Sequence, residues 1–176
     1  MTNQINEATQ LDIDQKIQAA ADKYEKILKS AGAPLEVFLN LAFIYWESTD
    51  YGFNTAHGLP SDFIQRAGRR YIEVLNEARK RFTDNPEVEF WQKYFDYVTL
   101  GEESFIDHCR TLIDKGGVPD AVYIHLFSEC PDPAYIPYLQ RLLVESEKLP
   151  TTKNRYIASV IRSLLQLANR PPDQTA

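Results

Sequence analysis

The sequence predicts an all-α protein of about eight helices, arranged as antiparallel hairpins that stack into a short superhelix. Three observations support this fold class. Apolar residues recur with helical rather than alternating spacing along almost the whole chain. Hydrophobic residues make up 44% of the 176 positions and charged residues 25%, as in ordinary globular domains. Glycines and prolines separate the periodic segments at short intervals, which favours hairpin connections.

The sequence pattern predicts two helices in the N-terminal part of the chain. The first spans about 12–30 and carries one apolar stripe, and Gly32 and Pro34 end it. The stripe consists of Ile13, Ile17, Ala20, Ala21, Tyr24, Ile27 and Leu28. The second helix spans about 35–48 and is apolar on nearly all sides, which indicates burial between neighbouring helices.

Residues 49–60 interrupt the helical pattern. This segment, TDYGFNTAHGLP, contains two glycines, a proline and the turn-forming residues Asp50 and Asn54. A connection of about twelve residues is long for a helical hairpin, and long loops in compact domains are often functional. Ser61 is then expected to cap a third helix over about 62–82, whose inner face is apolar.

Five further helices complete the predicted domain. Proline or Asp-Pro opens several of them and glycine closes others, as is typical of helix boundaries. We expect these helices at about 86–101, 105–116, 119–127, from 132 onward, and at 151–168. Residues 169–176, which include two adjacent prolines, are expected to form a flexible tail.

Two short patterns repeat within the chain at different offsets. They are Pro34-x3-Phe38-x6-Tyr45 with Pro86-x3-Phe90-x6-Tyr97, and Ala20-x3-Tyr24-x2-Ile27 with Ala67-x3-Tyr71-x2-Val74. With these residues, the region 12–115 resembles degenerate tetratricopeptide repeats. The positions that match best are Phe38, Leu41, Ala42, Tyr45, Phe90, Tyr97 and Gly101.

The C-terminal third carries a different pattern. Residues 132–139, DPAYIPYL, have the DP…IP.L opening of HEAT repeats, which the region 119–168 resembles. Together the two resemblances imply one helical-repeat domain over 1–168. Families of this kind act as protein-binding scaffolds, so the resemblance implies that a partner protein binds in a concave groove.

Composition and motifs argue against several functions. The formal net charge of −6 disfavours nucleic acids and anionic membranes as ligands, because both require a basic surface. The sequence lacks Gly-rich nucleotide-binding motifs, CxxC pairs and His or Cys ligands at i, i+4 spacing. We therefore expect no cofactor, no metal site and no catalysis. Two cysteines and no long apolar segment lead us to expect a cytoplasmic protein.

Charge is distributed unevenly along the chain. Residues 66–81 contain six basic side chains against two acidic ones, whereas residues 84–107 contain seven acidic side chains against one lysine. Both stretches can form solvated helix faces with i, i+4 ion pairs. The alternative is an acidic patch that binds a basic partner, such as a toxin or effector protein.

The predicted partner-binding residues are Asn40, Phe43, Glu47, Tyr51, Phe53, His57, Arg66, Arg69 and Arg70. The first three share a narrow stripe of the second helix, and in tetratricopeptide-like stacks this helix lines the groove. The next three lie in 49–60, where surface aromatic side chains are typical interface anchors. The arginines follow on the next helix. In the alternative interpretation, Phe43 packs beneath the following segment, while Tyr51 and Phe53 turn into the core.

The function predicted from these features is non-catalytic binding of another protein, through the groove and the 49–60 segment, by a monomer or weak homodimer. Three alternatives stay open. One is an immunity or inhibitor protein that neutralises a toxin. Another is a small enzyme with a site near His57 and Arg66–Arg70. The last is a structural homo-oligomer that uses exposed aromatic residues for self-association.

Overall fold

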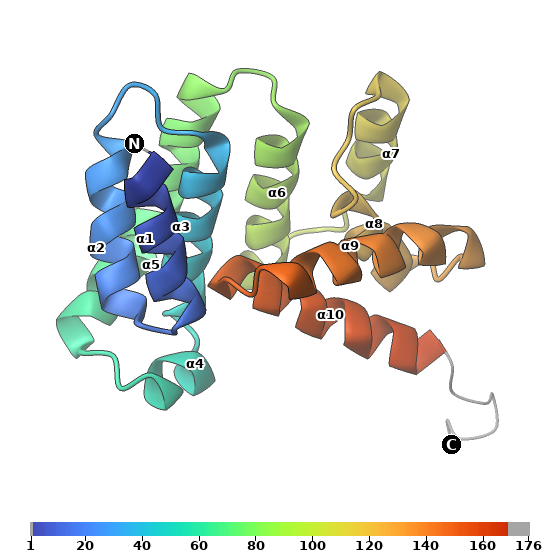
Figure 1. Ribbon diagram of the computed structural model, residues 1–176. Coiled ribbons are helices and arrows are strands. Elements are labelled where there is room, and N and C mark those ends of the chain that lie inside the picture. Colours follow the sequence, from blue (N-terminus) through green and yellow to red (C-terminus); the bar gives the residue numbers. More distant parts are fainter. Residues whose placement is uncertain (1, 169–176) are drawn as a thin grey trace. The chain divides into compact units, whose positions relative to one another are not determined.

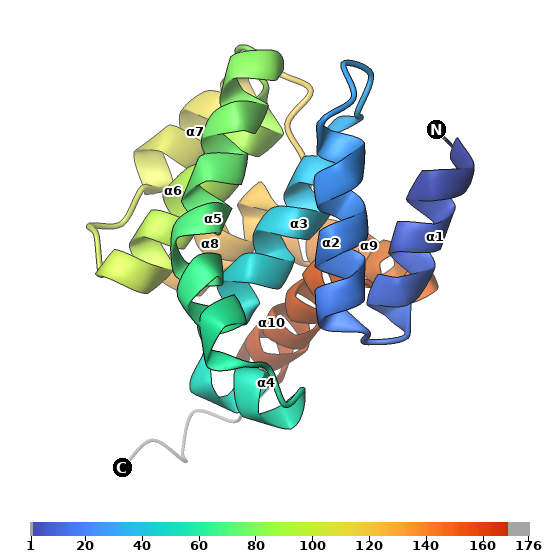
Figure 2. The ribbon, with the colours of Figure 1, turned by 90° about the vertical axis from the view of Figure 1, so that its left-hand side faces the viewer.

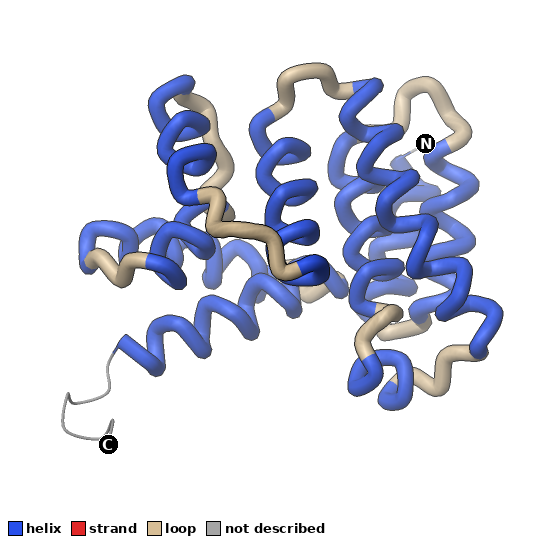
Figure 3. Tube along the Cα trace, turned by 180° about the vertical axis from the view of Figure 1, so that it is seen from behind, coloured by secondary structure: helices blue, strands red, loops and turns tan. Residues whose placement is uncertain are grey.

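The computed structural model describes residues 2–168, and within them all regular secondary structure is helical, with ten α-helices and one 3₁₀ turn joined by turns and loops (Figure 3). The predicted all-α class is therefore confirmed. None of the helices in the described range is both long and apolar enough to cross a membrane. The predicted tail, 169–176, lies outside the described residues.

Contacts divide the chain into two compact units. Unit 1 is the chain up to Asp84 together with Leu149–Lys153, and unit 2 is Asn85–Lys148 together with the chain from Asn154. The division falls after the helix that ends at Arg81, whereas the sequence patterns placed the change of repeat type between 115 and 119. Residues 149–153 belong to unit 1 although the residues on both sides of them belong to unit 2, and the sequence pattern did not predict this.

Unit 1 contains five helices in chain order. They are α1 (Thr2–Ile13), α2 (Ile17–Leu28), α3 (Leu35–Glu47), α4 (Tyr51–Ala56) and α5 (Ser61–Arg81). Helix α1 packs on α2, α2 on α3, and α3 on α5, so that α3 lies in the middle (Figures 1 and 2). Every residue from Val37 to Trp46 is buried, which confirms the prediction of a helix buried between its neighbours.

Helix α5 is amphipathic over its whole length. Its buried residues are Phe63, Ala67, Tyr71, Val74, Leu75 and Ala78. They recur at three- and four-residue spacing and face α3, while the charged side chains lie on the remaining surface. The predicted inner face is thus confirmed. Pro60, rather than Ser61, occupies the N-cap position, and Ser61 is the first helical residue.

Unit 2 contains the remaining elements. They are α6 (Pro86–Leu100), α7 (Ile106–Lys115), α8 (Val122–Glu129), the 3₁₀ turn η1 (Pro133–Tyr135), α9 (Ile136–Lys148) and α10 (Thr152–Ala168), whose first two residues belong to unit 1. Asn85 caps α6 by accepting hydrogen bonds from the Glu87 and Val88 amides, and Gly101 ends it in a left-handed conformation.

The core of unit 2 is largely aromatic. Phe90, Trp91 and Tyr94 of α6 are all buried, and each pair of their rings lies within 4.9 to 5.7 Å between centroids. The Tyr94 hydroxyl lies 2.8 Å from the Tyr156 hydroxyl of α10. The aromatic residues of this region thus build the core, as their helical spacing predicts.

Two helices were not expected, which raises the number in the described range from about eight to ten. The stretch expected as one helix over 12–30 is broken at 14–16, where Gln15 has a φ of 59°. Helix α1 precedes this break; it is polar and buries just two side chains, Ala8 and Asp12, so no apolar stripe marks it. Helix α4 occupies the segment expected to be a loop.

The described residues show no repeated hairpin unit. The region 86–115 was expected to form a second tetratricopeptide-like hairpin, but the main packing partner of α7 is α8. Large side chains at the relevant positions of α6, such as Tyr94, are engaged in the aromatic core of unit 2.

Candidate functional site

The 49–60 segment forms a short exposed helix. Asp50 is the N-cap of α4, and its carboxylate accepts a hydrogen bond from the Phe53 amide over 2.8 Å. The Thr49 hydroxyl donates to the carbonyl of Trp46 over 2.7 Å, which ties the start of the segment to α3. None of the six residues of α4 is buried. The segment is therefore an ordered element that projects from unit 1.

The aromatic residues of this segment have different environments. Tyr51, the first residue of α4, is 81% exposed. Phe53 is half-buried, and its ring lies 4.4 Å from the imidazole of His57, between centroids. The sequence left open whether Tyr51 and Phe53 lie on the surface or turn into the core. Phe53 is partly turned inward, whereas Tyr51 lies on the surface.

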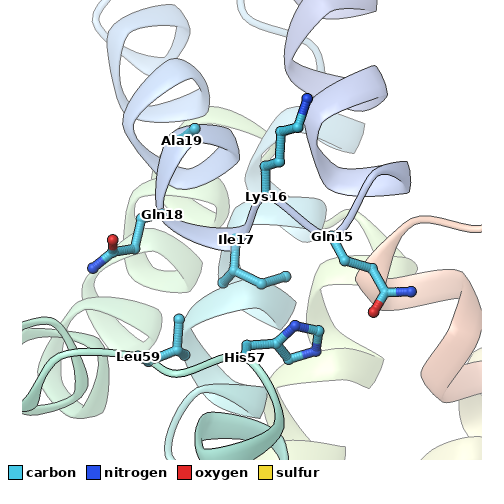
Figure 4. Close-up of a pocket in the computed structure, with 7 residues that line it drawn as sticks. All are labelled: Gln15, Lys16, Ile17, Gln18, Ala19, His57 and Leu59. Carbon is cyan, nitrogen blue, oxygen red and sulfur yellow. The ribbon is translucent and has the colours of Figure 1, made fainter.

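A pocket of about 260 Å³ lies beside α4. It is lined by Gln15, Lys16, Ile17, Gln18, Ala19, His57 and Leu59. In Figure 4 the side chains of His57 and Leu59 face Ile17, whereas the ammonium group of Lys16 points away from His57. Residues 15–19 form the turn between α1 and α2 and the first turn of α2.

The pocket offers limited chemistry. Its seven lining residues include one imidazole and one ammonium group, and they include no hydroxyl, thiol or carboxylate side chain. The arrangement can hold a polar or anionic group, and its candidate nucleophiles are the His57 imidazole and the Lys16 amine, which points away from His57. None of the arginines from 66 to 70 lines it, so the structure does not join His57 to that cluster as the enzyme alternative requires.

Arg70 is committed to an ion-pair cluster inside unit 1. Its Nε and Nη2 donate to the two carboxylate oxygens of Glu25 over 2.7 and 3.0 Å, and its Nη1 donates to Glu73 and Glu77. The Tyr45 hydroxyl also donates to Glu25. Burial acts to raise the pKa of Glu25, but the hydrogen bonds and charge of Arg70 outweigh it and lower that pKa.

The other two arginines lie on the surface. Arg69 is exposed, and Arg66 is exposed beside Asp22, with 3.7 Å between the charged atoms. The Arg66 guanidinium also lies 5.2 Å from the centroid of the Phe63 ring. Of the three predicted arginines, the structure thus leaves Arg66 and Arg69 available to a partner and uses Arg70 to join α5 to α2.

The predicted groove position of Asn40 and Phe43 is wrong, because both side chains are buried, with exposures of 2% and 0%. The Asn40 amide donates to the Tyr24 hydroxyl over 3.3 Å, and that hydroxyl donates to Thr9 of α1. Phe43 meets Trp46 edge-on at 5.9 Å. Helix α1, which the sequence pattern did not predict, thus reaches the polar stripe that was expected to face a groove.

Glu47 lies at the C-terminal end of α3 and is half-buried. Burial is the main cause that raises its pKa to about 7, and the negative charge of Asp50 contributes. A carboxylate in this position is therefore destabilising at neutral pH. Of the predicted site residues, Glu47 and Arg70 have a shifted pKa. Of these two, Glu47 is the one whose protonation changes near pH 7.

Replacing Glu47 with glutamine is expected to stabilise the protein above pH 7 by about 2 kcal/mol. The folded state holds a proton on Glu47 that the unfolded state, with a pKa of about 4.3, releases. Stability is therefore lost as the pH rises from about 4.3 to about 7, and Glu47→Gln removes this loss.

Thermal unfolding of both proteins between pH 4 and pH 8 measures this effect. Glu103→Gln, at an exposed position, serves as the matched control and should leave the pH profile unchanged. A stabilisation by Glu47→Gln that is equal at pH 4 and pH 8 would contradict the raised pKa.

Sequence reasoning missed the pocket residues 15–19. It treated 12–30 as one continuous helix, because Ile13 and Ile17 are four residues apart, which is the ordinary spacing of one helical stripe. The apolar spacing therefore carried no signal of the turn at 14–16. Among the described residues, no three His, Cys, Asp or Glu side chains gather in a way that would hold a metal ion.

Comparisons of the chain with protein-family models, with curated proteins and with solved structures found no match.

Proposed function

We propose that this protein binds another protein at α4, with Tyr51 as the central contact. The observation that carries the proposal is the 81% exposure of Tyr51 on an ordered and capped helix. A tyrosine buries a large apolar area and loses little conformational freedom when it is bound, which is why this residue type is enriched at binding hot spots.

The surroundings of Tyr51 support the same use. Asp50 fixes the start of α4, and the contact between Phe53 and His57 fixes its end, so α4 is ordered before a partner arrives. A surface ordered in advance loses less entropy on binding than a flexible loop. Arg66 and Arg69, exposed on α5, would add positive charge that a partner's acidic groups can meet.

We also propose that the helices stack as antiparallel hairpins. Support comes from the packing of sequence neighbours in unit 1, where α1 packs on α2 and α2 on α3. A reducing cellular compartment is part of the same proposal, because Cys109 and Cys130 are both free thiols.

Affinity capture from the native cell tests the binding function. We expect Tyr51→Ser to lower the recovery of the partner at least tenfold, since truncation of an anchor costs about 2 kcal/mol or more. Leu100→Ser, at an apolar position of unit 2 that is 67% exposed, is the control and should leave the recovery unchanged. Equal recovery with both variants would contradict a role for α4.

Light scattering at two concentrations separates this function from self-association. A mass that is independent of concentration in both the wild type and Tyr51→Ser is expected if α4 binds a different protein. Dimers that disappear in Tyr51→Ser would instead assign α4 to contacts between copies.

A further inference from the structure

One histidine holds the segment that joins α6 to α7, residues 101–105. His125 of α8 is completely buried, and its Nε2 accepts a hydrogen bond from the backbone N–H of Phe105 over 3.2 Å. The same nitrogen lies 3.3 Å from the Ser104 hydroxyl. The imidazole also stacks on the Phe105 ring, with centroids 3.8 Å apart and planes 8° apart. The segment is thus fixed to α8 at its C-terminal end.

This contact requires a neutral imidazole. A proton on Nε2 would point at the Phe105 N–H, which is itself a donor, so the hydrogen bond would be replaced by repulsion. The second nitrogen, Nδ1, is buried and has no hydrogen-bond partner within residues 2–168. The positive charge would therefore be unsolvated as well as misplaced. Burial accordingly lowers the pKa of His125, while the negative charge of Glu129 opposes this shift.

The titratable groups nearest to His125 come from α6 and α8. The Tyr97 ring of α6 meets the imidazole edge-on at 4.8 Å, and its hydroxyl donates to Glu129 over 2.7 Å. Glu129 lies one turn after His125 on α8 and is exposed. It is the group whose charge acts on the imidazole. The 101–105 segment itself adds Glu102 and Glu103, which are both exposed.

The other elements that pack on α8 bring no buried charge to the imidazole. On α7 the fully buried titratable group is Cys109, a neutral thiol whose pKa burial raises to about 12. Tyr135 of η1 and Tyr138 of α9 lie against Tyr123 at the start of α8, with ring centroids 5.5 and 3.9 Å away. Glu129, which is exposed, is thus the acidic group that acts on the imidazole, and burial outweighs its effect.

We propose that His125 is a pH-sensitive clasp, and that protonation of its imidazole in mildly acidic solution releases the 101–105 segment from α8. Release frees the Phe105 ring, which is now 8% exposed. The adjoining end of α6 already presents Val98 and Leu100, with exposures of 45% and 67%. Acid therefore enlarges an apolar edge of unit 2.

The pH dependence has a defined sign. The released imidazole takes up a proton with an ordinary pKa of about 6.5, whereas the clasped form binds it less readily. The equilibrium constant for release then rises as the pH falls below about 6.5, by up to tenfold per pH unit for one proton. Above that pH the segment stays closed.

Hydrogen exchange of the full chain, followed by NMR between pH 7.5 and pH 5, tests the clasp. After correction for the intrinsic pH dependence of exchange, we expect the Phe105 amide to exchange up to tenfold faster per pH unit below about 6.5. The amide of Trp91, in the core of the same unit, should keep its protection. Loss of protection at both amides together would overturn the proposal, because it would report unfolding of the whole unit.

The matched variant is His125→Gln, which keeps an acceptor for the Phe105 N–H but does not titrate. Its Phe105 amide should exchange without a pH-dependent step, and a step equal to that of the wild type would overturn the proposal. The NMR titration of the His125 ring in the wild type needs no variant. Its midpoint should coincide with the step at Phe105, and release while the ring is still neutral would overturn the proposal.

Discussion

Replacing Asp12 with alanine is expected to lower the free energy of unfolding by about 3 kcal/mol. Asp12 lies on α1 and is completely buried. Its Oδ1 accepts from both the backbone N–H and the hydroxyl of Thr152, over 2.8 and 2.6 Å. The carboxylate therefore satisfies the first turn of α10 and complements its dipole. Without it, two donors of Thr152 remain buried with no acceptor in that position.

Chemical denaturation followed by circular dichroism measures the loss, and Asp14→Ala provides the control. Asp14 is a neighbouring carboxylate that is exposed, so its removal should change stability by less than about 0.5 kcal/mol. Asp12→Asn keeps an acceptor oxygen without the charge, and we expect an intermediate value. If Asp12→Ala and Asp14→Ala destabilise the protein equally, the contact with Thr152 does not hold 149–153 on unit 1.

The elements that the sequence pattern predicts well are those with a long apolar stripe. Helix α5 buries Phe63, Ala67 and Tyr71 at helical spacing, and α3 is apolar on nearly all sides. Such helices are stabilised by burial of apolar side chains, and the spacing of those side chains is visible in the helix's own sequence. Helix α1 is different, because polar contacts support it. Lys23 of α2, for example, pairs with Glu7 of α1, and no local pattern encodes that pairing.

The candidate site could be predicted in part. The glycines and the proline of 49–60 correctly marked a segment outside the core, and Tyr51 is exposed there. The burial of Asn40 could not be predicted, because its partner Tyr24 lies on another helix, α2. The pairing of Lys153 with Glu36 at 2.9 Å likewise joins residues 117 positions apart. A polar stripe on one helix faces either solvent or the polar side chains of a neighbouring element. The spacing of residues within that helix does not distinguish the two.

The sequence likewise does not tell whether a predicted arginine faces solvent or pairs with a residue of the same protein. The substitution Arg70→Ala decides this for Arg70. We expect this substitution to lower the free energy of unfolding by about 3 kcal/mol, because Glu25 loses a bidentate partner in a half-buried position. A partner-binding arginine on the surface would instead leave stability unchanged and weaken capture. Arg69→Ala, at the exposed neighbouring position, is the control and should change stability by less than about 0.5 kcal/mol.

The pH dependence of this loss distinguishes an ion pair from simple packing. Arg70 lowers the pKa of Glu25, so the stabilisation is complete above the unfolded-state pKa of about 4.3 and is lost as the pH falls through the lowered value. The difference between the wild type and Arg70→Ala should therefore shrink in acid. A difference that stays constant from pH 7 to pH 3 would mean that Arg70 acts through the packing of its aliphatic stem, and that its charge is not what joins α5 to α2.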